Sequence, residues 1–396
     1  MKTLKAIYRY VDFLYFFLRQ IPIHLKASGK IHTSILKRTT QQLHLLLSNS
    51  ITANDYYKLN LYKDEIPIHN KKTFLGTYRM SRYYRYLNPT SYDILARDKV
   101  LFSLIADKFG LPTPRIVATF NPTHGMFAGR NLSTIDELQS FLKLPETQYL
   151  FIKPVSGMEG RQALAIGERI PQKDAWLTLP NKTPIELHEI ISLLLSANGD
   201  DGRFIFQPLL QTHAFLSKLV PNVVSTIRII TCFDDQPSIC GAVLRLGNGY
   251  TPTDNISSGG LAVPIHIESG TLDRAISWNN LIQETHDSHP FSGQPILNTQ
   301  IPYWNETLTI LNDAASKLRQ LRCIGWDIAV TDVGPIIIEM NTLSGTTAIQ
   351  AGRDTGLLAT PLRGLLEPHD GICESALSLH SIKAKNRRPL FRKIRS

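Results

Sequence analysis

Apolar residues recur at helical spacing in several stretches of the first two hundred residues. Positions 100, 101, 104, 105 and 109 are apolar and fall on one side of a helix, and a glycine with two nearby prolines ends it. A second helix is predicted after the capping segment at residues 133–137. A third is predicted to open at Thr183-Pro184 and to run to Asn198-Gly199. Residues 1 to about 90 are predicted to be mainly helical and carry no chemical motif.

Runs of β-branched and aromatic residues predict strands in the remainder of the chain. A helix from about Trp304 to Leu321 leads into a predicted β-hairpin, with arms at residues 326–331 and 335–341. This mixture of helices and strands indicates α+β lobes rather than a regular parallel βαβ array. The other predicted strands lie at residues 149–154, 163–166, 204–206, 224–233, 239–246 and 262–267.

Composition and charge limit the classes of protein that fit. The 396 residues are 43% hydrophobic and 19% charged, enough for a sizeable core and for two or three lobes that share one active site. The four cysteines are widely spaced and form no C-x-x-C pair, so we expect a reducing cytosol and neither structural zinc nor a disulfide framework. The net charge of +10 indicates attraction to an anion such as a nucleotide, an acidic sugar, an anionic lipid or a nucleic acid.

Three segments bear on location and partners. No apolar run is long enough to span a bilayer, and residues 10–18 are too short and too polar for a signal peptide. Basic residues flank that segment, which fits either an interfacial helix or, as the favoured alternative, a helix packed on the protein body. The tyrosine- and arginine-rich residues 78–86 fit single-stranded nucleic acid or, more ordinarily, a helix with buried aromatics. The chain ends in a basic tail.

The predicted hairpin carries three oxygen-bearing side chains. A turn centred on Val333 places Asp327 opposite Glu339, with Cβ atoms about 4.5–5.5 Å apart. Asn341 projects from the same face two residues farther on. Two acids in an apolar hairpin need a compensating cation, and hard oxygen ligands suit magnesium. The alternative is a solvent-facing polar stripe on an amphipathic hairpin.

Basic side chains stand where an anion is expected. Lys153 ends a predicted strand before a turn with two glycines, and Lys99 begins a predicted helix. Both settings favour phosphate, although an ordinary turn and a surface lysine are the alternatives, and the spacing matches neither a P-loop nor a dinucleotide fingerprint. Arg228 and Arg245 lie inside apolar β-rich runs and need anionic partners, either a transferred group or a structural carboxylate. Residues 254–260 add a polar loop with paired glycines.

Taken in order, six motifs resemble the ATP-grasp superfamily. They most resemble the sugar-transfer-associated ATP-grasp family, which is related to α-L-glutamate-ligase-like proteins and is found with polysaccharide biosynthesis. The resemblance runs from about residue 90 to 360, roughly two thirds of the chain. The motifs are D-K-V-L-F…G-L-P-T-P (98–114), F-I-K-P-V-S-G-M-E-G (151–160), S-T-I-R-I-I-T (225–231), A-V-L-R-L-G (242–247), D-N-I-S-S-G-G-L (254–261) and G-W-D-I-A…G-P-I-I-I-E-M-N (325–341).

The resemblance implies a fold and a set of roles. The expected fold is α+β, with two α/β lobes holding ATP between them behind an N-terminal helical extension. The resemblance divides the chain into the extension (1–90), a small lid subdomain (91–203), a core that binds metal and substrate (204–366) and the basic tail (367–396). The implied ATP contacts are Lys99, Lys153, Ser156, Gly157, Gly160 and Gln207; the magnesium ligands are Asp327, Glu339 and Asn341; and the residues near the transferred group are Arg228 and Arg245.

The resemblance also implies a reaction. Such enzymes use ATP and Mg²⁺ to convert a carboxylate to an acyl phosphate and then join it to an amine, here on a small or sugar-linked substrate in cell-surface polysaccharide assembly. A small-molecule or sugar kinase and a non-catalytic nucleotide-binding protein at the membrane surface are the alternatives. The expected location is the cytoplasm or the inner face of the membrane, and nucleic acid is not an expected partner. Met158 and Glu159 depart from the usual glycine loop.

Overall fold

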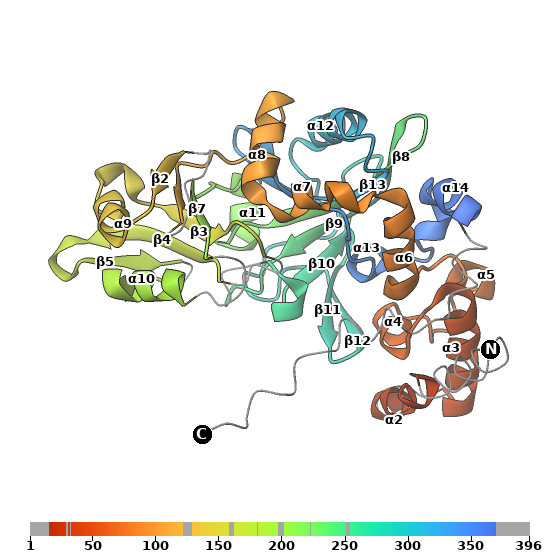
Figure 1. Cartoon of the computed structure of the whole chain (residues 1–396). Coiled ribbons are helices and arrows are strands. Elements are labelled where there is room, and N and C mark those ends of the chain that lie inside the picture. The colour runs from red at the N-terminus through yellow and green to blue at the C-terminus, as the bar shows by residue number, and fades with distance from the viewer. Residues whose placement is uncertain are drawn as a thin grey trace, which may run out of the picture.

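The N-terminal part of the chain is a group of short helices at one end of the molecule (Figure 1). The computed structural model describes residues 16–28, 31, 33–121, 129–157, 162–179, 181–196, 202–221, 223–250 and 254–369. The predicted helical character of the extension is confirmed within these residues, whereas most of residues 10–18 and the basic tail lie outside them. The helices are α2 (Ile21–Ser28), α3 (Ile35–Asn49), α4 (Ala53–Lys58), α5 (Ile68–Lys71), α6 (Thr77–Leu87) and α7 (Asp93–Arg97).

A first seven-stranded sheet forms the lobe at the opposite end of the molecule, with the strand order β2-β1-β7-β3-β4-β5-β6 (Figure 1). The helices α9 (Ile135–Leu142) and α10 (Leu187–Leu195) pack their buried leucines against it. The strands are β1 (Ala118–Phe120), β2 (Arg130–Leu132), β3 (Leu150–Pro154), β4 (Leu164–Ile170), β5 (Ala175–Thr178), β6 (Pro184–Glu186) and β7 (Phe204–Pro208).

Two predictions for this lobe need correction. The helix predicted to open at Thr183-Pro184 begins only at Leu187, because Pro184–Glu186 pairs with β5 as an edge strand and Glu186 then takes the helix N-cap. The predicted division between residues 203 and 204 separates β7 from its own sheet. That strand pairs with β1 and β3, so a boundary after Pro208 keeps both sheets whole.

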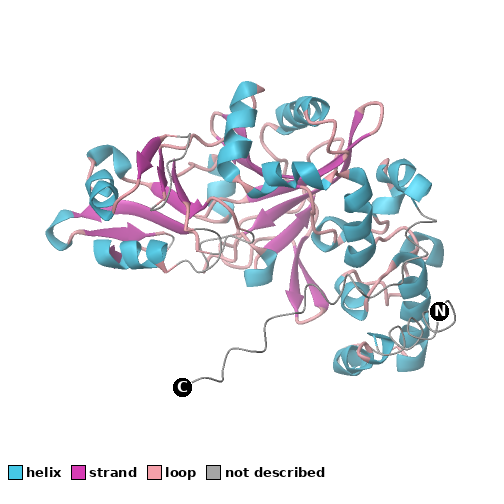
Figure 2. Cartoon of the chain, in the orientation of Figure 1, coloured by secondary structure: helices cyan, strands magenta, loops and turns pink. Residues whose placement is uncertain are grey.

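The second sheet also has seven strands, in the order β12-β11-β10-β9-β8-β13-β14, with every neighbouring pair antiparallel. It lies between the helical extension and the first lobe (Figures 1 and 2). Its strands are β8 (Thr226–Phe233), β9 (Pro237–Leu246), β10 (Leu261–Pro264), β11 (Ala275–Asn279), β12 (Ile282–His286), β13 (Cys323–Thr331) and β14 (Gly334–Asn341).

Helices cover both faces of the second sheet, which makes its central strands the deepest part of the core. On one face, α8 (Lys99–Lys108), α11 (Ala214–Leu219) and α12 (Trp304–Lys317) pack on apolar residues of β8 and β13. On the other, α6, α13 (Thr347–Gln350) and α14 (Leu362–Leu366) cover the cysteine-bearing ends of the strands. Tyr83 and Tyr84 of α6 are buried there, whereas Tyr78 and Tyr86 are partly exposed. Two of the four aromatics of residues 78–86 are therefore used in packing.

The described helices include none that is both long enough and apolar enough to cross a membrane.

Candidate active site

The predicted carboxylate hairpin is present, with Asp327 on β13 directly opposite Glu339 on β14. Its turn differs from the prediction. Thr331 pairs with Gly334 across a two-residue turn, and a register shift between Asp327 and Ile328 then restores the pairing with Glu339. Without this β-bulge, the turn would place Ile338 opposite Asp327, so the bulge brings the two carboxylates together.

Asp327 is buried beside a cross-strand arginine. The strand register places Arg228 of β8 opposite Asp327. The guanidinium binds the carboxylate in a bidentate manner, with Nη2 donating to Oδ2 at 2.7 Å and Nε donating to Oδ1. Nη1 of the same arginine donates to the Ser344 hydroxyl at 3.2 Å. Burial alone would raise the pKa of Asp327, but Arg228 and Arg245 outweigh it and hold that pKa at about 2. Asp327 is therefore charged at any physiological pH.

Arg245 extends this ion pair into a chain of alternating charges. Its Nη2 donates to Asp327 Oδ2 at 3.3 Å and to Thr226 Oγ1 at 2.7 Å. Asp254 lies on the far side, with Oδ2 3.4 Å from Arg245 Nε, and accepts the backbone N–H of Thr226 at 3.0 Å. Asp254, Arg245, Asp327 and Arg228 thus compensate one another in a nearly dry environment, where an unpaired charge would be costly.

Sequence reasoning named Asp254 only as the start of a polar loop and missed its partnership with Arg245. The available signal was the requirement that each buried arginine have a carboxylate nearby. The pairing itself depends on the register of β8, β9 and β13, which are far apart in sequence. Ser344 was missed for the same reason, because it follows β14 and reaches Arg228 only in the folded sheet.

Lys153 comes from the first sheet and lies within electrostatic reach of the carboxylates of the second. It lies near the end of β3, is almost fully buried, and its ammonium lies 5.6 Å from the Phe151 ring centroid. Burial is the main influence on its pKa and lowers it to about 8, while Glu339 and Asp327 act in the opposite direction. Burial and Asp327 in turn raise the pKa of Glu339, and Lys153 opposes this. The two lobes therefore meet at a lysine and a carboxylate pair.

Lys99 fastens the start of α8 to the loop that follows Lys153. Its Nζ donates to the carbonyl oxygens of Val155 at 3.3 Å and Gly157 at 3.2 Å. Asp98 caps the helix by accepting the N–H groups of Val100 and Leu101 and pairs with Arg203. Ser156 and Gly157 are described in this loop, and Gly157 has a φ of +146°. Gly160, with Met158 and Glu159, lies outside the described residues.

Gln207 does not join this group of charges. It is buried on β7 opposite Phe151, and its Nε2 donates to the Pro114 carbonyl at 3.0 Å. The structure thus gives its amide a scaffold partner on the sheet that carries Lys153. Its adenine or ribose contact remains a prediction.

The carboxylate pair has the chemistry that magnesium requires. Asp327 lies opposite Glu339 and raises its pKa, a repulsion that a shared proton or a cation between the two carboxylates relieves. The Nδ2 atom of Asn341 is buried and has no hydrogen-bond partner. No cluster of three His, Cys, Asp or Glu side chains suitable for a metal occurs in the described part of the chain, so the donor set here is two carboxylates and an amide. Those three oxygen donors fit a hard divalent cation that also binds substrate phosphates.

Comparison with known proteins gives one family match. Residues 78–363 match the family described as sugar-transfer-associated ATP-grasp. No curated protein matches the chain.

The solved structures to which the chain is similar share little sequence with it. D-alanyl-alanine synthetase A from Vibrio cholerae is 9% identical, with 71% of this chain and 64% of that chain covered and a TM-score of 0.38. D-alanine-D-alanine ligase from Coxiella burnetii is 15% identical, with coverages of 74% and 60% and a TM-score of 0.35. The enzyme of the same name from Helicobacter pylori is 14% identical, with coverages of 69% and 61% and a TM-score of 0.37. The match spans less than two thirds of each of these three proteins.

Proposed function

Because the chain belongs to the sugar-transfer-associated ATP-grasp family and is an ATP-grasp enzyme, we propose that it joins a carboxylate to an amine through an acyl phosphate. One observation carries the proposal. The opposed carboxylates of Asp327 and Glu339 on one sheet lie within electrostatic reach of the buried ammonium of Lys153 on the other. A site with acids on one wall and a lysine on the other suits a polyphosphate bound with a divalent cation.

We assign the nucleotide to the space between the two lobes. Lys153 and Lys99 neutralise phosphate oxygens, and the loop that contains Ser156 and Gly157 covers them. Gly160, which follows in the same glycine-containing segment of the sequence, is assigned the same role on the family resemblance. Gln207 contributes to the adenine or ribose side. Asp327, Glu339 and Asn341 hold magnesium, which when bound neutralises phosphate charge and orients the γ-phosphoryl group.

The proposed reaction has two steps. A carboxylate oxygen of the substrate attacks the γ-phosphorus of ATP, the bond to the β-phosphate oxygen breaks, and ADP leaves. The amine nitrogen then attacks the carbonyl carbon of the acyl phosphate, inorganic phosphate leaves, and the nitrogen loses a proton to form the amide. Arg228 and Arg245 orient the carboxylate and stabilise the oxyanion of the tetrahedral intermediate.

The described surroundings of the site favour ligation over phosphorylation of a hydroxyl group. A hydroxyl acceptor needs a general base within hydrogen-bonding reach. Of the acidic groups in the site, Asp327 and Asp254 are already bound to Arg228, Arg245 and Thr226, and Glu339 is assigned to magnesium. Both arginine side chains are only 15% exposed, so water screens their interactions with a bound carboxylate poorly.

We place the reaction in cell-surface polysaccharide or sugar-conjugate assembly, with a sugar acid or amino acid as the carboxylate. The support is the association of the family with sugar transfer. The proposed location is the cytoplasm, at the inner face of the membrane. The first lobe, up to Pro208, is assigned to the nucleotide, and the second to metal and acceptor.

Glu339→Gln tests the observation that carries this proposal. It removes one negative charge from the carboxylate pair but keeps the shape of the side chain. We expect magnesium-dependent formation of ADP to fall roughly a hundredfold or more, without a change in melting temperature. Glu268→Gln, at an exposed acid in the same lobe, should leave both quantities unchanged. A Glu339→Gln enzyme with normal ADP formation would remove the basis of the metal assignment.

A further inference from the structure

The two N-terminal helices α2 and α3 belong to a segment with an unusual charge distribution. Residues 13–54 contain no aspartate or glutamate but carry five basic side chains, Arg19, Lys26, Lys30, Lys37 and Arg38. Arg38 is buried in the helical core, whereas Arg19, Lys26 and Lys37 are exposed. The outward, solvent-facing side of α2 and α3 is therefore positive, and this segment contributes no acidic residue to it.

Large apolar residues are also exposed on these two helices and just before them. Ile21 and Leu25 are 37% and 57% exposed and lie four residues apart on one side of α2, and Leu18, which is 50% exposed, precedes that helix by a turn. On α3, Leu36 and Leu47 are 77% and 54% exposed and lie eleven residues, or about three turns, apart on one side of the helix. Single exposed apolar residues are ordinary, but several on two adjacent helices mark an interaction surface.

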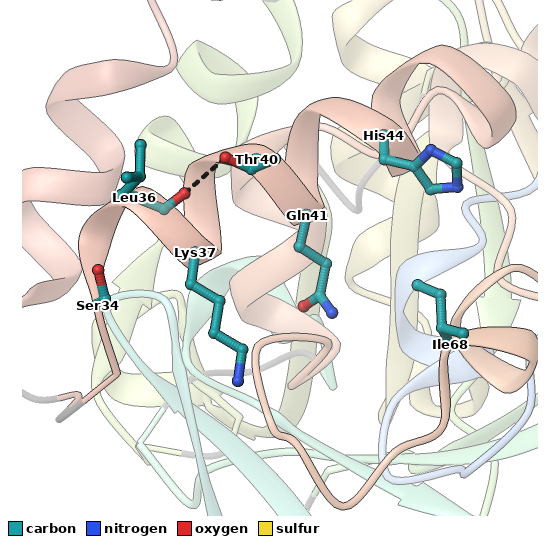
Figure 3. Close-up of a pocket in the computed structure, with 7 residues that line it drawn as sticks. All are labelled: Ser34, Leu36, Lys37, Thr40, Gln41, His44 and Ile68. Carbon is teal, nitrogen blue, oxygen red and sulfur yellow. Dashed lines mark hydrogen bonds between the residues drawn. The ribbon is translucent and has the colours of Figure 1, made fainter.

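A surface hollow of about 620 Å³ adjoins this side, between α3 and Ile68 (Figure 3). Its wall combines apolar, hydroxyl and basic side chains. Lys37 is ion-paired with Asp64 at 2.9 Å, but both side chains are more than half exposed, so the pair is weak and open to exchange with another anion. The hollow therefore offers a phosphate group a basic side chain, Lys37, next to the apolar side chains of Leu36 and Ile68. The lining side chains include Ser34, Leu36, Lys37, Thr40, His44 and Ile68.

We propose that the outward side of α2 and α3 docks on an anionic lipid bilayer. Leu18, Leu25 and Leu36 enter the boundary between headgroups and acyl chains, while Lys26 and Lys37 contact lipid phosphates. A second copy of the chain is a poorer occupant, because a symmetric dimer through this side would bring two positive surfaces together. Such docking would hold the enzyme at the proposed membrane location, whichever reaction it catalyses.

The test uses the full chain and vesicles of phosphatidylcholine with and without phosphatidylglycerol. We expect sedimentation with the anionic vesicles at low ionic strength and loss of binding at high ionic strength. Lys26→Gln should weaken partitioning about fivefold, and the double variant Leu36→Glu with Leu47→Glu should weaken it on the order of tenfold or more. All three positions are exposed, so the fold should persist.

Val333→Glu is the matched control, because Val333 is 91% exposed at the tip of the β13–β14 hairpin in the other part of the molecule. Equal partitioning of all these variants, or absence of wild-type binding, would overturn the docking surface. A change in oligomeric state of the leucine variants, without a change in vesicle binding, would assign the surface to a second copy and also overturn the proposal. ADP formation measured without vesicles distinguishes a failure of docking from a failure of the proposed reaction.

Discussion

Lys153 illustrates how a single residue gains a functional property from its position. Its ammonium is nearly excluded from water, and this burial lowers its pKa to about 8 against the attraction of Glu339. A phosphate beside such a group replaces lost hydration with a direct charge interaction. The sequence placed this lysine before a glycine-containing turn, but its burial could not be predicted, because it depends on both lobes.

Replacing Lys153 with alanine should weaken ATP binding by roughly ten- to hundredfold, the effect of losing one hydrogen bond to a charged group. Calorimetric titration of ATP measures this change. Lys173→Ala, at an exposed lysine in the same lobe, is the control and should bind ATP as the wild type does. The wild-type affinity should also decline as the pH rises through about 8, because the neutral amine then predominates in the free protein. Equal affinities for the two variants would contradict a phosphate contact.

At the scale of elements, the registers of β8, β9, β13 and β14 determine which charges meet. The opposition of Asp327 and Glu339 was predicted from the hairpin and is confirmed, although the predicted turn was wrong by one residue. Residues 336–338 are all isoleucine, so the apolar pattern could not reveal the β-bulge that restores the pairing of Asp327 with Glu339. The strand Pro184–Glu186 was missed because a proline at that point is also a common helix start.

The pairing of β8 with β13 makes Arg228 the cation that compensates Asp327 in the protein without ligands. If Asp327 binds magnesium as proposed, the ion must share Asp327 with that guanidinium or displace it. Arg228→Lys keeps the positive charge but cannot bind both carboxylate oxygens of Asp327 in a bidentate manner. We expect Mn²⁺, titrated without nucleotide and detected by its electron paramagnetic resonance signal, to bind several-fold more tightly to this variant.

ADP formation by Arg228→Lys should nevertheless fall, because the arginine is also proposed to orient the acceptor carboxylate. Arg322→Lys provides a control at an exposed ion pair with Asp234 in the same sheet, and it should alter neither quantity. Weaker Mn²⁺ binding by Arg228→Lys would indicate that the arginine positions Asp327 for the metal rather than competing with it.

At the scale of the whole molecule, the order of six loose motifs was enough to predict the family and the α+β fold, and both are confirmed. The chain of charges from Asp254 to Arg228 was beyond sequence reasoning, because it joins strands separated by up to a hundred residues. The lobe boundary was misplaced because β7, although close in sequence to the second lobe, completes the first sheet. The roles of the site residues and of the extension remain predictions.

The central claim is that a carboxylate is activated as an acyl phosphate, and hydroxylamine tests it most directly. The protein is supplied with ATP, magnesium and candidate sugar acids or amino acids, and hydroxamate and ADP are measured together. We predict hydroxamate in amounts that match the ADP formed with the true carboxylate, and roughly a hundredfold less with Glu339→Gln. A stable phosphorylated product that accumulates with ADP, with no hydroxamate, would contradict the ligase mechanism and assign the enzyme to phosphorylation of a hydroxyl group.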